Sequence, residues 1–184
     1  VLLVSGIGYS QENPAKERHR VSPVYNMTDD DFKQFNSFVS SNLNIDSVEQ
    51  ATFKIFNEYR RYVGVSDLEF DTTLQKVALI QSEFMSSIQA ATHIHTNTKL
   101  RTPPMRLKSV DPNGSIDFVS EIAQISCYGS CISRKRNISE NILDLFYYSK
   151  SHISMIEDSE STKVGISIVI RNKSTFYVVV VFGK

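Results

Sequence analysis

The sequence lacks several features that would place it in a specialised class. Its 184 residues include no tryptophan, only 2 cysteines, 7 glycines and 5 prolines. Two cysteines cannot build a disulfide scaffold or a four-thiolate zinc site, and so few glycines and prolines exclude collagen-like or linker-like sequence. No apolar run of about 18 residues is present, so no transmembrane helix is predicted. The 20 basic side chains balance the 20 acidic ones, which leaves no basic field to attract nucleic acid.

The residues that are present are typical of one globular domain preceded by an arm. Hydrophobic residues make up 41% of the chain and charged residues 22%, which argues against wholesale disorder. We expect an N-terminal arm with one helix over residues 1–45 and the domain over residues 46–184. The arm helix would align three aromatic side chains, Phe32, Phe35 and Phe38. These rings predict either core packing or an apolar groove that binds lipid.

Local patterns along the domain predict helices on both sides of a small sheet. Asp71 precedes an apolar periodic stretch and is placed to cap a helix. Two runs of β-branched and aromatic residues end the chain and predict a hairpin whose last strand is covered on both faces. Segment 116–125 fits a strand or a helix start, and stretch 93–114 indicates a loop with one short helical turn. The expected helices are 47–63, 72–88 and 139–146, and the expected hairpin strands are 164–170 and 176–182.

The side chains that could carry chemistry are three histidines and one acid. His93, His95 and His152 lie where loops or helix starts present side chains to clefts. Glu121 stands inside an apolar segment, where an acid must be paired, hydrogen-bonded or at a cleft edge. It fits either a strand-end charge facing water or a cleft carboxylate that orients a histidine. The sequence has no P-loop, nucleophile elbow, glycine-rich dinucleotide motif or His-Glu-x-x-His motif.

The two cysteines are close together in the sequence Cys127-Tyr-Gly-Ser-Cys131. In an oxidising compartment they could close a small loop through a disulfide, and in a reducing compartment they would remain two thiols. Their spacing is not the Cys-x-x-Cys pattern of redox proteins. The pair is therefore a disulfide candidate, with free thiols as the alternative.

An ordered series of short motifs resembles the CAP superfamily, which comprises cysteine-rich secretory, antigen 5 and pathogenesis-related 1 proteins and is also called the SCP domain. The resemblance covers about residues 50–183 and is similar to the bacterial form of the domain around His152. Its motifs are Asn57-Glu58-Tyr59-Arg60, Gly64, Leu68-Glu69-Phe70-Asp71, Leu74, Ala78, Ser82, Met85, His95-Thr96-Asn97, Thr102-Pro103, Arg106, Glu121-Ile122-Ala123, Ser149-Lys150-Ser151-His152, Ile156, Val164-Gly165-Ile166 and the run from Tyr177 to Gly183.

The resemblance implies a three-layer α-β-α sandwich with a central antiparallel sheet, and a cleft with two histidines and two acids. It assigns His95 and His152 as the histidines and Glu121 as the first acid. His93 competes with His95, because counting forward from Met85 favours His93 whereas counting back from Arg106 favours His95, which we prefer. The position of the second acid falls near Ser149, which is not acidic.

The implied cleft is therefore incomplete. In some family members the two histidines hold a divalent metal, so the resemblance implies at most weak zinc binding by His95 and His152.

The resemblance also implies a secreted or cell-surface protein that binds rather than catalyses, so we assign no catalytic residue. The expected partner is an extracellular ligand or host protein, including lipid or sterol, and not nucleic acid. Contact with a membrane would come only through an N-terminal lipid tether, as in a lipoprotein on a bacterial outer surface. A metal-dependent hydrolase using the same histidines and Glu121, or a lipid or sterol carrier, is the alternative.

Overall fold

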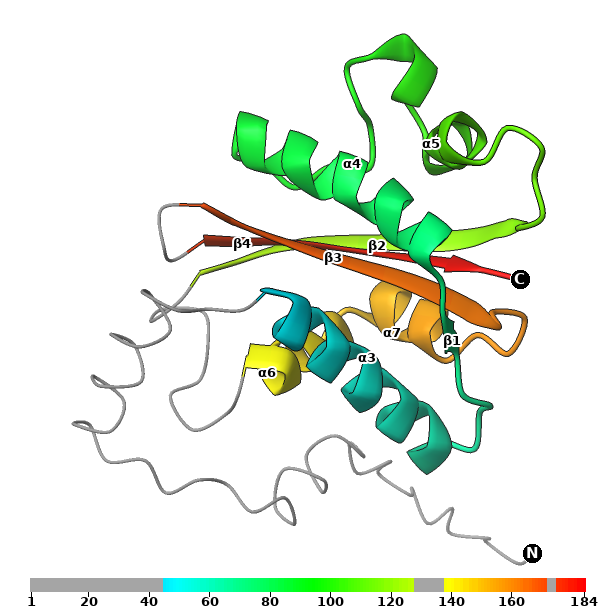
Figure 1. Ribbon diagram of the computed structural model, residues 1–184. Helices are drawn as coiled ribbons and strands as arrows, with labels where there is room; N and C mark the ends of the chain where they lie inside the picture. The colour runs from blue at the N-terminus through cyan, green and yellow to red at the C-terminus, as the bar shows by residue number, and fades with distance from the viewer. Residues whose placement is uncertain (1–44, 128–137, 172–174) are drawn as a thin grey trace, which may run out of the picture.

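The structure is a computed structural model that describes residues 45–127, 138–171 and 175–184 (Figure 1). The expected arm helix with Phe32, Phe35 and Phe38 lies outside the described residues. The disulfide prediction also lies outside them, because neither the side chain of Cys127 nor any part of Cys131 is described. The division into arm and domain therefore stays a prediction.

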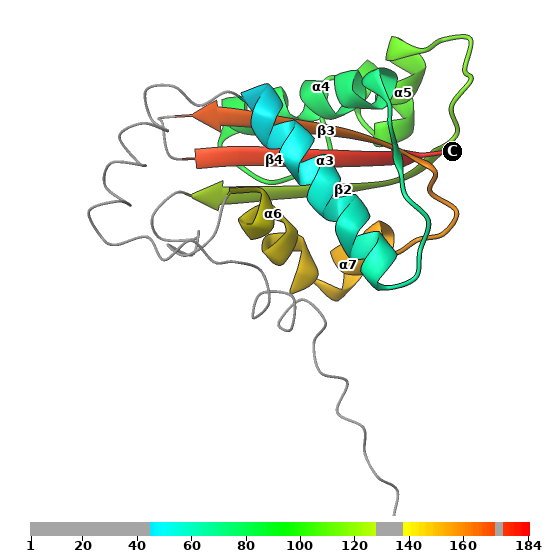
Figure 2. The same cartoon turned by 60° about the horizontal axis from the view of Figure 1, so that its bottom comes forward.

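Two layers of helices enclose one four-stranded sheet, as expected for the α-β-α sandwich. The strand order is β1-β3-β4-β2; β1 pairs with β3 in parallel and the other pairs are antiparallel. The strands are β1 (Glu69–Phe70), β2 (Phe118–Cys127), β3 (Lys163–Arg171) and β4 (Thr175–Gly183). One face carries α4 (Thr72–Ile88), η1 (Thr98–Leu100) and α5 (Pro103–Val110), and the other carries α3 (Ile45–Tyr62), α6 (Ile138–Tyr147) and α7 (Lys150–Ile156) (Figures 1 and 2).

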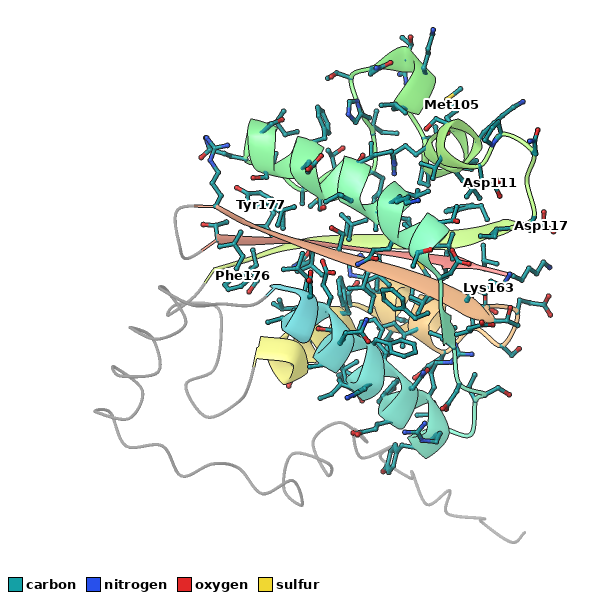
Figure 3. All side chains as sticks on the ribbon, viewed as in Figure 1. Met105, Asp111, Asp117, Lys163, Phe176 and Tyr177 are labelled. Carbon is teal, nitrogen blue, oxygen red and sulfur yellow. The ribbon has the colours of Figure 1, made fainter. Side chains whose placement is uncertain are left out.

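Strand β4 is the centre of the core, as its nearly continuous apolar sequence predicts. Successive side chains of a strand point to opposite faces, and Phe176 and Tyr177 do so in Figure 3. Val178, Val180 and Phe182 pack with Phe176 in the core beneath α3, α6 and α7. Val179 and Val181 pack with Tyr177 and the buried side chains of α4. The hairpin and its double coverage are thus confirmed.

Helix α4 begins where the sequence predicts and lies directly against β3. The Asp71 side chain accepts hydrogen bonds from the amides of Thr73 (2.8 Å) and Leu74 (2.9 Å), which fixes the first turn. Gly165 of β3 permits close contact, because a Cβ there would lie 2.0 Å from the backbone nitrogen of Gln75. Ile88, the last residue of this helix, is 45% exposed.

Arg60 of α3 is completely buried and ties that helix to two loops. Its Nε donates to the Ser66 carbonyl at 2.6 Å. Its terminal nitrogens donate to the carbonyls of Ile156 (2.7 Å), Asp158 (3.0 Å) and Ser161 (3.1 Å). Burial lowers the pKa of Arg60, while the charges of Asp158 and Asp67 act in the opposite direction. The guanidinium therefore bridges α3 to the connection between α7 and β3.

The structure assigns secondary structure to two segments for which the sequence predicted alternatives or a shorter helix. Segment 116–125 contributes mainly to strand β2, not to a helix. The stretch expected to hold one short turn contains an eight-residue helix, α5, with prolines in its first turn where their missing amides cost nothing. None of the helices in the described ranges combines the length and apolar character needed to span a bilayer.

Candidate functional site

The candidate site is built around Glu121, which lies on β2 at one edge of the sheet. Glu121 is 5% exposed, although it is a carboxylate in an apolar strand. Its Oε1 lies 3.0 Å from Nδ1 of His93, and its Oε2 lies 2.5 Å from Nη2 of Arg106. Of the two roles that the sequence left open, the structure therefore shows the paired carboxylate in contact with a histidine, and not a charge facing water.

Arg106 holds both the acid and the loop that carries the histidine. It is fully buried on α5, and its Nη1 donates to the carbonyls of His93 (3.3 Å) and Leu100 (3.1 Å). From the other side, Gln81 of α4 donates from Nε2 to the Thr92 carbonyl at 2.6 Å. Two buried side chains thus fix consecutive carbonyls of the loop, so the position of His93 is set by α4 and α5 together.

The contact with Glu121 corrects our preference for His95. The His95 ring stacks on Phe84 with centroids 4.0 Å apart and planes inclined at 25°. Its Nδ1 accepts a hydrogen bond from the Asn97 amide at 2.9 Å. Burial lowers the pKa of His95, and the positive charge of Arg106 lowers it further. The segment is irregular and not an extended strand, so His95 is held against α4 while His93 reaches the acid.

His152 approaches from the other helical layer. It lies on α7, and its ring packs edge-on against Phe146 at 5.5 Å between centroids. Burial lowers the pKa of His152, and the charge of His93 adds to this effect. Ser149 precedes α7, and its hydroxyl lies 3.1 Å from that of Ser151; within the described ranges it has no hydrogen bond to His93, Glu121 or His152.

The sequence comparison gives the decisive observation on family. Residues 53–182 match the cysteine-rich secretory protein family, CAP. This chain belongs to the CAP family. The resemblance drawn from the short motifs is thereby confirmed, and the layers around β4 form the CAP sandwich.

Solved structures similar to this CAP chain include several bacterial proteins. An outer surface protein from Borrelia burgdorferi is 20% identical, with a TM-score of 0.61 over 77% of this chain and 96% of that chain. An extracellular SCP-domain protein from Bacillus anthracis is 19% identical, with a TM-score of 0.55 over 86% of this chain and 44% of that one. A cysteine-rich secretory protein from Staphylococcus aureus is 14% identical, with a TM-score of 0.52 over 78% and 40%. A search of curated proteins found no match.

The possible metal ligands around Glu121 are too few for a complete metal site. A catalytic zinc site takes three protein ligands and a structural site takes four. Among the described residues, no group of three or more His, Cys, Asp or Glu side chains is arranged to hold a metal ion. Because both oxygens of Glu121 face His93 and Arg106, the available donors reduce to the imidazoles of His93 and His152. This set does not fit a resident catalytic metal.

The contacts that Arg106 and Gln81 make in the candidate site were not predicted from the sequence. Arg106 was recognised only as a position in the family resemblance, and Gln81 was not singled out. One signal was available: Glu121 in an apolar segment requires a buried partner, and a cation three residues after Pro103, at a helix start, could supply one. The contact itself depends on how α5 packs against β2, which the spacing of residues does not reveal.

Proposed function

We propose that this CAP chain is a secreted or cell-surface protein that binds an extracellular ligand through the cleft of His93, Glu121 and His152, and does not catalyse a reaction there. The observation that carries the proposal is the engagement of both Glu121 oxygens. A general base must place a free oxygen or nitrogen within hydrogen-bond reach of the proton that it removes. The Glu121 side chain is only 1% exposed and its oxygens contact His93 and Arg106, so it is not presented to a substrate from solvent. It is therefore a positioning group for the histidine.

The contacts of His93 indicate which atom the cleft offers to a ligand. A carboxylate only accepts hydrogen bonds, so Nδ1 of His93 carries the proton that is directed to Glu121. In the neutral ring, Nε2 is then left as an acceptor or metal ligand. The His93 side chain is 47% exposed, so a ligand from solvent can reach it. His152 and the adjacent Phe146 add a second imidazole and an aromatic surface.

The descriptions of similar proteins support an extracellular place of action. The Borrelia relative is described as an outer surface protein and the Bacillus relative as an extracellular protein. An extracellular ligand or host protein is accordingly the partner class that we propose. A lipid anchor for this chain would be an additional feature that the proposal does not need.

The experiment compares binding with hydrolysis in the same cleft. Zinc is titrated by calorimetry into the wild type, His93→Ala and His152→Ala, with His95→Ala as the matched control. Hydrolysis of 4-nitrophenyl acetate is measured with and without zinc, and compared with Glu121→Gln. We expect only weak zinc binding that His93→Ala and His152→Ala abolish and His95→Ala preserves, and no zinc-dependent hydrolysis. Zinc-dependent hydrolysis that disappears in Glu121→Gln would show that the protein is a hydrolase.

A further inference from the structure

One segment of the chain, which includes α5, has no acidic side chain. Residues 84–110 contain no aspartate or glutamate, although the whole chain has 20 of them. The same segment contains four basic residues, which are Lys99, Arg101, Arg106 and Lys108. The charges of the chain as a whole balance, but this segment is therefore positive.

Three of these four cations lie at the surface. Arg106 is buried and pairs with Glu121, so its charge is compensated inside the domain. Lys99, Arg101 and Lys108 are exposed, and none of them forms an ion pair with an acid in residues 45–127, 138–171 or 175–184. Their charges are thus not compensated by an acid in this part of the chain.

Hydrogen bonds hold the exposed cations close to α5. The His95 amide donates to the Arg101 carbonyl at 3.0 Å. Nη1 of Arg106, which belongs to α5, donates to the Leu100 carbonyl at 3.1 Å. The short helix η1, which carries Lys99, is therefore held beside α5, and it projects from the layer of α4 on the side away from the sheet (Figure 1).

Two large apolar side chains are exposed in the same segment. Met105 is 46% exposed, and Figure 3 shows it on the side of α5 that faces away from the sheet, next to η1. Lys108 follows Met105 by three residues on this helix, so the two side chains are neighbours on its surface. Ile94 is 50% exposed and directly precedes the residue whose amide bonds to Arg101. We call Ile94, Lys99, Arg101, Met105 and Lys108 the basic surface.

We propose that the basic surface docks on a membrane that presents anionic lipid headgroups. Lys99, Arg101 and Lys108 contact the headgroups, and Ile94 and Met105 enter the boundary between headgroups and acyl chains. The two apolar residues favour a membrane over a soluble polyanion such as nucleic acid or a sulfated polysaccharide, because a polyanion has no apolar phase in which to bury them. This contact does not require the N-terminal lipid tether that the family resemblance implied, and it uses none of the three cleft residues.

The first experiment measures co-sedimentation of the full chain with lipid vesicles. Vesicles of phosphatidylcholine alone are compared with vesicles of equal parts phosphatidylcholine and phosphatidylglycerol. We expect binding only to the mixed vesicles, and weaker binding at high salt, which screens exposed charges. Lys99→Glu combined with Lys108→Glu should weaken this binding at least about tenfold. The matched control, Lys54→Glu combined with Lys150→Glu, makes the same change of charge in the opposite helical layer and should leave binding unchanged.

The second experiment uses the absence of tryptophan from the chain. Met105→Trp and Ile94→Trp each place a single indole on the basic surface. Tyr148→Trp is the control, because Tyr148 is 68% exposed and follows α6 in the other helical layer. When mixed vesicles are added, the fluorescence emission of the first two variants should move to shorter wavelength as the indole leaves water, and that of Tyr148→Trp should not change.

Three results would overturn the proposal. The first is that the wild type binds neither kind of vesicle, or binds both equally, which would mean that the exposed cations do not select anionic headgroups. The second is that the two double variants bind the mixed vesicles equally well, which would place the contact elsewhere on the chain. The third is binding of soluble heparin as well as mixed vesicles, with no emission shift in Met105→Trp or Ile94→Trp, which would identify the partner as a soluble polyanion.

Discussion

Replacing Arg60 by lysine tests whether its four carbonyl contacts hold the α3 layer to the rest of the domain. Arg60 is fully buried and donates from three nitrogens to four backbone oxygens. Lysine keeps the positive charge but presents three donors from one atom and has no planar fork. It therefore cannot satisfy carbonyls that lie around the guanidinium on different sides.

The expected loss of stability follows from the number of carbonyls left without a donor. A hydrogen bond to a charged group contributes about 1.5–3 kcal/mol, and a buried group left unsatisfied costs about 1–3 kcal/mol. If lysine reaches two of the four oxygens, the other two lose their partners. Two unsatisfied carbonyls at about 1–3 kcal/mol each mean that Arg60→Lys should lower the free energy of unfolding by about 2–6 kcal/mol, and Arg60→Ala should lower it by more.

The neighbouring residue supplies a matched control for the same chemical change. The Arg61 side chain is 56% exposed and pairs with Asp67 at the surface, where ion pairs contribute about 0.2–1 kcal/mol. Urea unfolding followed by circular dichroism should show that Arg61→Lys changes stability by less than about 0.5 kcal/mol. Equal stabilities of Arg60→Lys and Arg61→Lys would show that the four carbonyl contacts of Arg60 do not stabilise the domain.

Three further predictions concern the histidines and the contact between α4 and β3. The NMR titration midpoint of His152 should lie below 6.5 and rise in His93→Ala, which removes a like charge; an unchanged midpoint would mean that the two rings are far apart. The folded-state pKa of His95 is also lowered, so the unfolded chain binds more protons and stability should fall as pH decreases below 6.5. His95→Phe, which keeps the stacking, should weaken this dependence in urea titrations at pH 7 and pH 5, and an identical slope would contradict it. Gly165→Ala should cost about 3 kcal/mol or more in thermal unfolding, because the added Cβ meets the backbone of Gln75 and Leu74 and not a movable side chain; an unchanged Tm would refute this.

Those helices and strands could be predicted whose formation is determined by residues close together in the sequence. The two β-branched runs give β3 and β4, and the Asp71 carboxylate gives the start of α4, since each signal acts within a few residues. Strand β1 was not predicted, because its two residues are extended only through pairing with β3. The eight residues of α5 were understated because their helical pattern is short, although Pro103 and Pro104 fit a first turn.

The candidate site could be predicted only in part, for the same physical reason. An acid in an apolar segment predicted two possible roles for Glu121, a strand-end charge facing water or a carboxylate that orients a histidine. Which histidine it meets depends on the path of a loop, and that path is set by Arg106, by the stacking of His95 on Phe84 and by other contacts between distant residues. These contacts join residues that are far apart in the sequence, so the spacing of residues did not distinguish His93 from His95.

The most direct test of the site is the proton position on each imidazole, read from nitrogen chemical shifts of the 15N-labelled protein. The structure predicts that neutral His93 carries its proton on Nδ1, directed to Glu121, whereas neutral His95 carries it on Nε2 because its Nδ1 accepts from an amide. Glu121→Gln should then shift the nitrogens of His93 and leave those of His95 in place. Finding the proton of His93 on Nε2, with His95 responding to Glu121→Gln instead, would contradict the arrangement on which the proposed binding cleft depends.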